Sequence, residues 1–220
     1  SPEMIDKMGD KSSAKETMKK AGIPTIPGSE GIVDNLEDAQ KISQKIGYPI
    51  MLKASAGGGG KGMRIVHKAK DLLKAWDQAR QESKSSFDND DMYIEKFIKN
   101  PRHIEIQIIG DSKGGACHLS ERDCSIQRRH QKLIEEGPWL TEEEREKIGK
   151  LVCKGAEAVG YKGLATFEFL RDKHGEFYFL EVNPRVQVEH TITEMITGHN
   201  LVELGIRIAQ GEPLTIRQED

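Results

Sequence analysis

The sequence predicts an α+β fold whose sheets are antiparallel. A glycine-rich loop at residues 55–62 is followed by the β-rich run 63–66, where a parallel βαβ unit would continue into a helix. Residues 103–109 and 116–119 flank a turn-forming segment, which is typical of antiparallel strands. Residues 166–170 and 177–182 flank a second turn-forming segment and predict a hairpin.

The composition is ordinary for a soluble protein, with 31% charged and 36% hydrophobic residues among 220. A net charge of −3 provides no bulk field that would draw the chain to nucleic acid or to a membrane. Cys117, Cys124 and Cys153 show no metal-like spacing, which predicts reduced thiols and a cytoplasmic location. No apolar run has the length of a signal peptide or a membrane span. The start at Ser1, without an initiator methionine, predicts a piece of a longer chain.

Five helices are expected between the strands. A capping box from Thr141 to Glu144 opens the fourth. The fifth should direct four apolar residues inward, namely Leu201, Leu204, Ile206 and Ile208. The expected helices span residues 12–20, 35–46, 68–83, 141–159 and 200–210.

The glycine loop favours contact with phosphate groups. Residues 57, 59 and 62 match G-x-G-x-x-G, but the dinucleotide interpretation fails because no helix follows. The Walker pattern also fails, since Lys61 is followed by Gly62 rather than by Ser or Thr. A strand–glycine loop–strand unit can fold over phosphates and present unobstructed backbone N–H groups, with Lys53 at its base. The alternative is a flexible hairpin tip, which would order four consecutive glycines at a high entropic cost.

The hairpin at residues 166–182 predicts a metal site. If His174 and Gly175 form a two-residue turn, Glu168 lies directly opposite Glu181. Two facing carboxylates among phenylalanines would repel each other, and a divalent cation with oxygen ligands removes that conflict. A four-residue turn would keep both carboxylates on one face.

Polar residues continue at every second position after Glu181. An extended chain would place them on one face, which is either a half-solvated edge strand or a binding surface. Arg185 and Glu189 would lie roughly 13 Å apart on a straight strand. The chain must therefore bend, at Pro184 or at the His190–Thr191 junction, if both are to touch one small anion. The alternating residues are Glu181, Asn183, Arg185, Gln187 and Glu189.

A basic cluster at residues 121–132 lies within an acidic chain. Interleaved aromatic residues are missing, so a small anion is favoured over RNA.

Taken in order, the segments MGDKSSA, GGGGKGMR, EKFI, NPRHIEIQ, ERDCSIQRRHQKLIEE, TFEFL and EVNPRVQVEH resemble the ATP-grasp portion of biotin carboxylase over nearly the whole chain. The segment RRHQKLIEE is most similar to the biotin carboxylase subunit of acetyl-CoA carboxylase. Pyruvate carboxylase and other acyl-CoA carboxylases are the alternatives. The resemblance implies two α+β subdomains with antiparallel sheets that bind nucleotide between them. It assigns residues 1–24 to a helical lead-in, 25–97 to a lid and 98–220 to the metal and bicarbonate subdomain. On this resemblance, the sequence is expected to be a fragment that lacks the family's N-terminal α/β domain and its C-terminal domain.

The resemblance also implies roles for individual residues. Glu168, Glu181 and Asn183 match the metal site. Lys132, Arg185, Gln187 and the backbone of Val188 match the bicarbonate site. Glu189 matches the base that deprotonates bicarbonate, so Lys132, Arg185 and Glu189 are the expected catalytic residues. The expected ATP contacts are Lys11, Lys53, Gly57, Gly58, Gly59, Gly60, Gly62, Met63, Glu95, Lys96, Ile98, His103, Gln127, His130 and Leu170.

The implied ligands are ATP, Mg²⁺ or Mn²⁺, bicarbonate, and biotin on a carrier protein. A carboxyltransferase partner, a homodimer and a place in fatty acid synthesis follow from the same resemblance, without nucleic acid or membrane partners. The alternative is an inactive nucleotide-binding fragment. Residues 135–141 form a shorter loop than the family's EEAP-containing loop, and Thr191 replaces a common proline.

Overall fold

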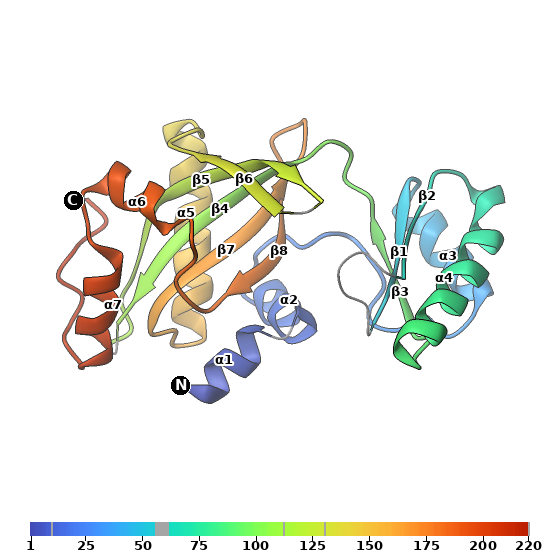
Figure 1. The fold of residues 1–220 in the computed structure, drawn as a ribbon, viewed down its shortest axis with the longest axis horizontal. Coiled ribbons are helices and arrows are strands. Elements are labelled where there is room, and N and C mark those ends of the chain that lie inside the picture. Colours follow the sequence, from blue (N-terminus) through green and yellow to red (C-terminus); the bar gives the residue numbers. More distant parts are fainter. Residues whose placement is uncertain (10, 56–61, 112, 130, 220) are drawn as a thin grey trace. The chain divides into compact units, whose positions relative to one another are not determined.

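The computed structural model describes residues 1–9, 11–55, 62–111, 113–129 and 131–219, apart from the side chains of Lys7, Lys11 and Ser12. The chain divides into two compact units (Figure 1). Unit 1 comprises Ser1–Thr25 and Asn100–Asp220, and unit 2 comprises Ile26–Lys99. The strands of each sheet pair in antiparallel fashion, as the sequence predicted.

Unit 2 is a three-stranded sheet with the order β2-β1-β3 and two helices on one face (Figure 1). Asn35 caps α3 by accepting a hydrogen bond from the N–H of Asp38, and the helix expected at 35–46 is confirmed. The helix expected at 68–83 instead begins at Leu72, after a 3-10 turn. The elements are α3 (Leu36–Ile46), β1 (Ile50–Ala54), β2 (Met63–Val66), the turn Ala69–Asp71, α4 (Leu72–Phe87) and β3 (Met92–Lys96).

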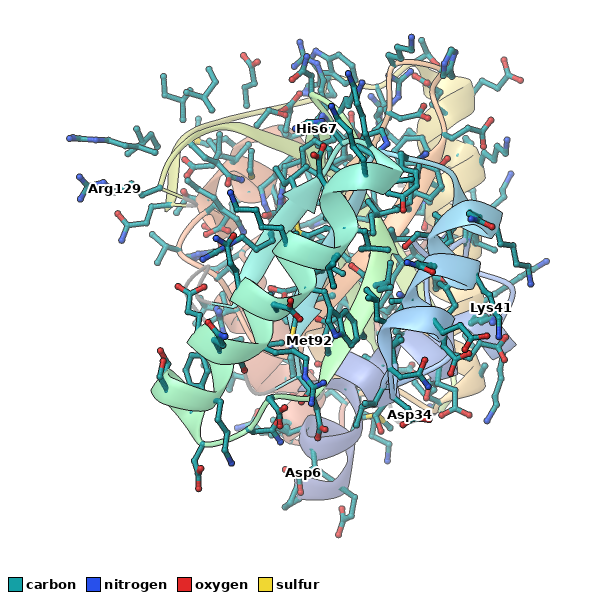
Figure 2. All side chains as sticks on the ribbon, turned by 90° about the vertical axis from the view of Figure 1, so that its right-hand side faces the viewer. Asp6, Asp34, Lys41, His67, Met92 and Arg129 are labelled. Atoms are coloured by element: carbon teal, nitrogen blue, oxygen red, sulfur yellow. The ribbon has the colours of Figure 1, made fainter. Side chains whose placement is uncertain are left out.

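The core of unit 2 forms between the sheet and these helices. Leu52 and Ile94 are fully buried, and Trp76 of α4 packs in the same cluster. Lys41 lies on the outer side of α3 and points away from the sheet (Figure 2). The apolar and polar sides of α3 therefore match its helical periodicity.

Unit 1 is built on a five-stranded sheet with the order β6-β5-β4-β7-β8 (Figure 1). Its strands are β4 (Arg102–Gly110), β5 (Ala116–Arg128), β6 (Gln131–Glu136), β7 (Gly163–Arg171) and β8 (Phe177–Asn183). Its helices are α1 (Pro2–Gly9), α2 (Lys11–Lys20), α5 (Glu142–Ala158), α6 (His190–Thr197) and α7 (Leu201–Ala209). Thr141 and Glu144 form the predicted capping box at the start of α5. Among the described residues, no helix combines the length and apolar content needed to cross a bilayer.

The sheet of unit 1 has one apolar face and one polar face. On the apolar face, Ile104, Phe167 and Phe169 are fully buried against residues of α2 and α5, including Met18 and Val152. The opposite face carries His103, Glu105 and Gln107 of β4, because side chains alternate along a strand. This division places the polar residues of four strands on one surface.

The predicted pairing of Glu168 with Glu181 is confirmed, although the predicted turn is wrong. Arg171 pairs with Phe177, so the connecting loop is the five-residue segment 172–176. A register shift then leaves Leu180 without a partner, and the two glutamates face each other beyond it. The shift also corrects a second expectation. Phe179 pairs with Phe169 on the apolar face, so the carboxylates do not lie among the phenylalanines.

The continuous polar strand expected from Glu181 to Glu189 is wrong beyond Asn183, where β8 ends. Arg185 donates its backbone N–H to the carbonyl of Asn183 over 2.8 Å, which bends the chain next to Pro184. The segment 184–189 is a loop that leads into α6, a helix that the sequence did not predict. Pro184 was one of the two positions at which the chain was expected to bend if Arg185 and Glu189 are to touch one small anion.

Three other expectations need correction. The strand expected at 116–119 continues to Arg128, and β6 follows it, so the basic cluster lies on a hairpin whose tip residue Arg129 points outward (Figure 2). Helix α1 was not predicted. Ile206 is 55% exposed, because it lies on the opposite side of α7 from buried Leu201 and Ile208.

Candidate active site

The centre of the polar face is a row of charged residues that crosses four strands. Arg122 of β5, Glu105 of β4, Glu168 of β7 and Glu181 of β8 are successive partners across the sheet. Arg122 and Glu105 are fully buried, Glu168 is 4% exposed, and Glu181 is half-buried. Neighbouring carboxylates at this depth repel each other unless cations separate them.

Lys132 provides one of these cations from β6. Its ammonium nitrogen lies 2.9 Å from Glu168 Oε1 and 2.6 Å from Glu189 Oε1, and it also pairs with Glu105. Burial by itself would lower the pKa of Lys132, but Glu105 and Glu168 raise it above its ordinary value. The ammonium therefore stays charged and holds three carboxylates from different segments around one point.

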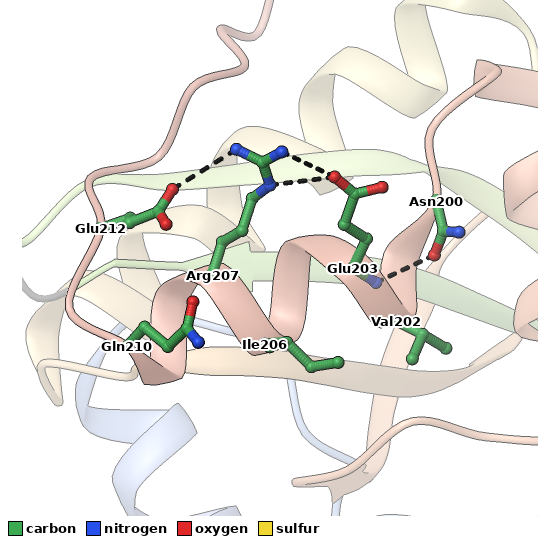
Figure 3. Close-up of a pocket in the computed structure, with 7 residues that line it drawn as sticks. All are labelled: Asn200, Val202, Glu203, Ile206, Arg207, Gln210 and Glu212. Carbon is green, nitrogen blue, oxygen red and sulfur yellow. Dashed lines mark hydrogen bonds and ion pairs between the residues drawn. The ribbon is translucent and has the colours of Figure 1, made fainter.

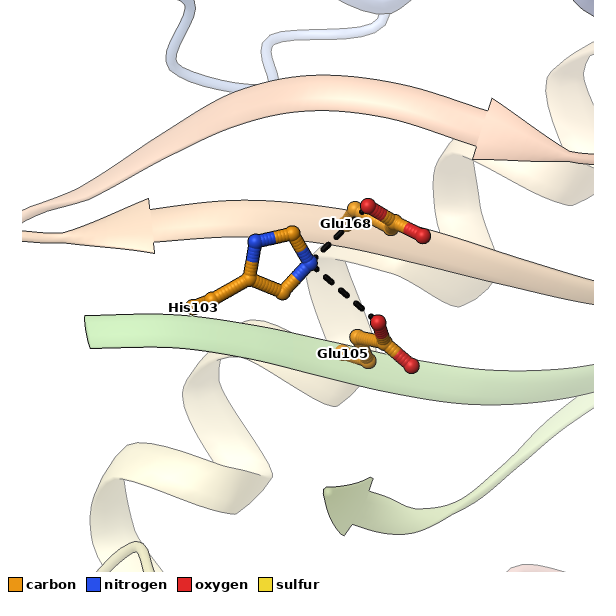
Figure 4. Close-up of side chains that lie close together, drawn as sticks. All are labelled: His103, Glu105 and Glu168. Atoms are coloured by element: carbon orange, nitrogen blue, oxygen red, sulfur yellow. Dashed lines mark ion pairs between the residues drawn. The ribbon is translucent and has the colours of Figure 1, made fainter. Parts of the chain in front are cut away.

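His103 provides a second cation between Glu105 and Glu168 (Figure 4). Its Nε2 lies 3.2 Å from Glu105 Oε1 and 2.9 Å from Glu168 Oε2. Burial would lower the pKa of His103, but the two carboxylates raise it to about 9. Burial acts in the opposite direction on the Glu168 carboxyl and would raise its pKa, but His103 and Lys132 lower that pKa to about 2. The site therefore holds an imidazolium and ionised carboxylates at neutral pH.

The predicted metal residues Glu168 and Asn183 are in direct contact. Glu168 Oε1 accepts hydrogen bonds from Asn183 Nδ2 over 2.8 Å and from Gln187 Nε2 over 3.0 Å. Glu181 faces Glu168 across the hairpin. Two carboxylates and an amide oxygen are hard donors that suit Mg²⁺, so these residues fit the predicted ion. The Asn183 oxygen now accepts a 3.1 Å hydrogen bond from Arg185 Nη2, and an ion at this position would compete with it.

The predicted bicarbonate residues are only partly brought together. Gln187 is 5% exposed and shares Glu168 with Lys132, while Glu189 contacts the same ammonium. Arg185 is exposed and bonds Asn183, and the Val188 side chain is 91% exposed. Lys132, Gln187 and Glu189 thus form one cluster, and Arg185 reaches its edge through Asn183.

Other predicted nucleotide residues of unit 1 lie beside this cluster. Leu170 is the cross-strand partner of His103 and is half-buried. Gln127 is the partner of Lys132 and donates a hydrogen bond to the Cys124 carbonyl over 2.8 Å. His130 and the side chain of Lys11 fall outside the described residues.

In unit 2, Lys53 and Glu95 form an ion pair with a 2.5 Å separation between Nζ and Oε2. Met63 is the cross-strand partner of Lys53 on the same sheet. Lys96 donates to the Gly47 carbonyl over 2.8 Å, and Ile98 is half-buried. The predicted contacts Gly57, Gly58, Gly59 and Gly60 fall outside the described residues.

Gly62, the last glycine of the loop, occupies a position that excludes larger residues. Its φ is +70°, and an added Cβ would lie 2.6 Å from the Cβ of Ala54. Its N–H donates to Glu82 Oε2 over 3.3 Å. The end of the glycine loop is therefore anchored against β1 and α4.

Two members of the charged row, Glu105 and Arg122, were not predicted from the sequence. Glu105 stands between His103 and Gln107 in an alternating run, and that period-two pattern could have identified it. Arg122 lies beyond residue 119, where its strand was expected to end. No alternation of side chains was therefore available to assign it to the polar face and to distinguish it from the other arginines of the basic cluster. Glu105 and Glu189 also lie near the Cys124 thiol, and ligand atoms of the three residues fall within 4.8 Å of one another.

An open groove of about 540 Å³ lies elsewhere, along the outer side of α7 (Figure 3). Arg207 occupies it between Glu203 and Glu212, at 2.7 Å and 3.5 Å. None of the predicted site residues that the structure describes lines this groove. The buried charged row is therefore the better candidate for the functional site.

Comparison with known proteins gives matches along the whole chain. Residues 10–217 match the family described as carbamoyl-phosphate synthase L chain, ATP binding domain. Biotin carboxylase of Nostoc sp. is 53% identical over 99% of this chain and 49% of its own length. Biotin carboxylase 1, chloroplastic, of Populus trichocarpa is 51% identical over 100% of this chain and 42% of its own length. The chain thus spans about half the length of the curated relatives it matches.

Solved structures give the same result. The biotin carboxylase domain dimer of Hydrogenobacter thermophilus 2-oxoglutarate carboxylase, in complex with MgADP, ADP and bicarbonate, matches with a TM-score of 0.88 and 51% identity. That match covers 99% of this chain and 48% of the other. The biotin carboxylase–β-γ-ATP complex from Campylobacter jejuni matches with a TM-score of 0.87 and 52% identity, over 98% and 48% of the two chains.

Proposed function

Because the chain belongs to the family described as carbamoyl-phosphate synthase L chain, ATP binding domain, we propose that it is the ATP- and bicarbonate-binding core of a biotin carboxylase. The resemblance to biotin carboxylase is confirmed by relatives that match 99% and 100% of the chain. The ATP-grasp fold is confirmed by biotin carboxylase structures with TM-scores of 0.88 and 0.87. The proposed division into a lead-in at 1–24, a lid at 25–97 and a metal and bicarbonate subdomain at 98–220 follows from the same family.

The proposed reaction uses ATP to activate bicarbonate as carboxyphosphate and then carboxylates N1′ of a carrier-bound biotin. One observation carries this proposal. The Lys132 ammonium bonds Glu168 and Glu189 at 2.9 Å and 2.6 Å, and so joins the predicted metal end of the site to its predicted bicarbonate end. Phosphoryl transfer depends on such positioning and charge neutralisation more than on covalent chemistry.

At the metal end, Glu168, Glu181 and Asn183 would hold Mg²⁺ or Mn²⁺, which would offset the charge of the phosphates. The MgADP in the Hydrogenobacter structure supports this assignment. Lys53 and Lys11 would neutralise phosphate oxygens, and the loop from Gly57 to Gly62 would cover them. The other proposed nucleotide contacts are Met63, Glu95, Lys96, Ile98, His103, Gln127, His130 and Leu170.

At the bicarbonate end, Lys132 and the Gln187 amide would donate hydrogen bonds to the anion, with the Val188 backbone and Arg185 completing its surroundings. The Glu189 carboxylate would accept the bicarbonate proton, so that the resulting carbonate oxygen attacks the γ-phosphorus and ADP leaves. Glu189 already lies 2.6 Å from Lys132, so one ammonium can orient both the base and the anion. Arg185 would then stabilise the enolate form of biotin.

The acceptor and the partners belong to the same proposal. A biotin carrier protein, a carboxyltransferase and a homodimer are expected for an acetyl-CoA carboxylase that serves fatty acid synthesis. Relatives include a 2-oxoglutarate carboxylase small subunit and the biotin carboxylase subunit of pyruvate carboxylase, so other carboxylases fit as well. Chloroplast relatives are also among the matches, and the cytoplasmic location stays a prediction.

The test begins with a calorimetric titration of the chain with MgATP, followed by measurement of ADP formation with bicarbonate and free biotin. Glu181→Gln should weaken MgATP binding about tenfold, because it removes a carboxylate ligand. Glu189→Gln should leave binding within about twofold and reduce bicarbonate-dependent ADP formation about a hundredfold, because it removes the base. Glu203→Gln, on the exposed side of α7, is the matched control and should change neither. Equal loss of MgATP binding in both site variants would refute this division of roles.

A second candidate is a nucleotide-binding core without turnover. It is favoured by Arg185, which is exposed and bonds Asn183 rather than joining the cluster of Lys132, Gln187 and Glu189. Binding of MgATP without bicarbonate-dependent ADP formation would support it. Absence of both would exclude the two candidates together.

A further inference from the structure

Arg122 is fully buried on the polar face, and its guanidinium bonds five residues from four segments of unit 1. Nη1 donates to Gln107 Oε1 and to Thr193 Oγ1, both over 2.8 Å. Nη2 donates to Glu105 Oε2 over 3.1 Å, to Thr166 Oγ1 over 3.1 Å and to Gln187 Oε1 over 3.2 Å. One side chain thus connects β4, β7, the loop 184–189 and α6.

Two of these bonds determine how the proposed bicarbonate residues are presented. Arg122 takes one oxygen of Glu105 and leaves the other, Oε1, to pair with Lys132. Arg122 also takes the oxygen of the Gln187 amide, so the amide nitrogen points at Glu168, 3.0 Å away. Without Arg122 the Gln187 amide could rotate, and Glu105 could turn both oxygens away from Lys132.

A third bond acts on the chain that carries Glu189. Thr193 is fully buried in the first turn of α6, four residues after Glu189. Its bond to Arg122 fixes this helix end to the sheet. Arg122 therefore bonds Glu105, which pairs with Lys132, and it bonds Gln187 directly. Through Thr193 it also holds α6, the helix that follows Glu189.

The energetic cost of this arrangement argues against a purely structural role. Burying a guanidinium costs several kcal/mol in lost hydration, and apolar residues of similar volume often stabilise a fold equally well. The apolar core of unit 1 lies on the other face of the sheet, so Arg122 is not needed to fill it. The planar guanidinium of Arg122 instead directs its N–H groups at fixed angles to several acceptors.

We propose that Arg122 is a positioning residue for the bicarbonate site, which holds Gln187 directly and Lys132 through Glu105. This proposal rests on the proposed function only for the identity of the anion, because the positioning itself is a property of the folded chain. Arg122 touches no substrate in this role. Its loss should affect the use of bicarbonate more than the binding of MgATP.

The test compares Arg122→Lys with Arg145→Lys. Both remove a guanidinium from a buried ion pair of unit 1, but Arg145 pairs with Glu121, outside the site. The first measurement uses ¹⁵N-glutamine labelling and follows hydrogen exchange of the Gln187 side-chain amide, assigned with a Gln187→Met variant. Exchange should accelerate at least tenfold in Arg122→Lys and stay unchanged in Arg145→Lys. Unchanged Gln187 exchange in a folded Arg122→Lys protein would overturn the proposal.

The second measurement is the dependence of ADP formation on bicarbonate concentration. Arg122→Lys should raise the KM for bicarbonate at least tenfold and leave the MgATP Kd within twofold of the parent value. An equal loss of affinity for both ligands would indicate general damage and overturn the proposal. If the parent chain forms no ADP in response to bicarbonate, the proposed function fails, and the Gln187 exchange still decides the role of Arg122.

A milder variant covers the case in which Arg122→Lys does not fold. Thr193→Val removes one acceptor of Arg122 and nearly preserves the side-chain volume. Gln187 exchange should then accelerate two- to fivefold. No acceleration in this variant would count against the proposal.

Discussion

Glu121 offers a sharp test of how the connection between β6 and α5 is held, because its carboxylate is fully buried and charged. Oε1 accepts hydrogen bonds from the N–H groups of Trp139 and Leu140 over 2.8 Å and 2.7 Å. Oε2 accepts one from Arg145 Nε over 2.6 Å. Burial would raise the pKa of Glu121, but Arg145 and the two backbone donors lower it below its ordinary value.

Glu121→Gln should lower the free energy of unfolding of unit 1 by about 3 kcal/mol at pH 7. The substitution leaves the guanidinium of Arg145 without its anion, and breaking a buried ion pair costs about 3–5 kcal/mol. The remaining amide oxygen can still accept one of the backbone bonds, so the lower end of that range is expected. Glu157→Gln, on the exposed side of α5, is the matched control and should change stability by less than about 0.5 kcal/mol.

The pH dependence of the loss follows from the depressed pKa. A carboxyl whose folded pKa lies below its unfolded pKa stabilises the fold above the unfolded value, and that stability disappears as pH falls through the folded value. The ordinary pKa here is 4.5, so the difference between parent and variant should be constant near pH 7 and should shrink on acidification below that value.

Urea unfolding followed by tryptophan fluorescence measures this difference. Trp139 lies beside Glu121 in unit 1, whereas Trp76 belongs to unit 2, so a Trp76→Phe background isolates the relevant signal. The reasoning is refuted if the loss at pH 7 is below about 1 kcal/mol, or if it is the same at pH 7 and at pH 3.

Two further predictions concern helix α5. Gly149→Ala should destabilise unit 1 by about 2–3 kcal/mol, because an added Cβ would lie 2.3 Å from the ring of buried His118; chemical unfolding measures this, and a loss below about 0.5 kcal/mol would contradict the close packing. Thr141→Ala should cost about 1 kcal/mol by removing the capping box, and Thr141→Ser should restore most of it; equal stability of the alanine and serine variants would show that the cap contributes little.

Much of the fold could be predicted from local patterns. Thr141 and Glu144 identified the start of α5, because a capping box is decided by a few neighbouring residues. The strand at Met63–Val66 was predicted with its observed bounds. Helix α6 was missed because the alternation up to Glu189 suggested an extended chain, and periodicity alone does not show where a strand ends.

The site could be predicted in part, for a related reason. Glu168 and Glu181 were found because a hairpin links them locally, and their facing positions are set by backbone pairing. Arg122 and Glu105 depend on which strand lies beside which, and strand order across a sheet is a tertiary property that no local pattern contains. Lys132 joins the cluster from β6, a strand whose existence was not predicted.

The unpaired residue Leu180 has a consequence for how the β7–β8 hairpin tolerates change. Phe177, Phe179, Glu181 and Asn183 share one parity along the chain, yet the first two face the apolar core and the last two face the charged row. Leu180 is an extra residue between these two pairs, and it reverses the face to which the following side chains point. Leu180 lies between the turn and the carboxylates. The aromatic residues next to the turn and the carboxylates beyond it therefore pair with β7 in two different registers. Deleting Leu180 would therefore leave Glu181 opposite Glu168 on the polar face, whereas a regular strand that kept Leu180 would place Glu181 opposite Phe167 and turn its carboxylate toward the phenylalanines.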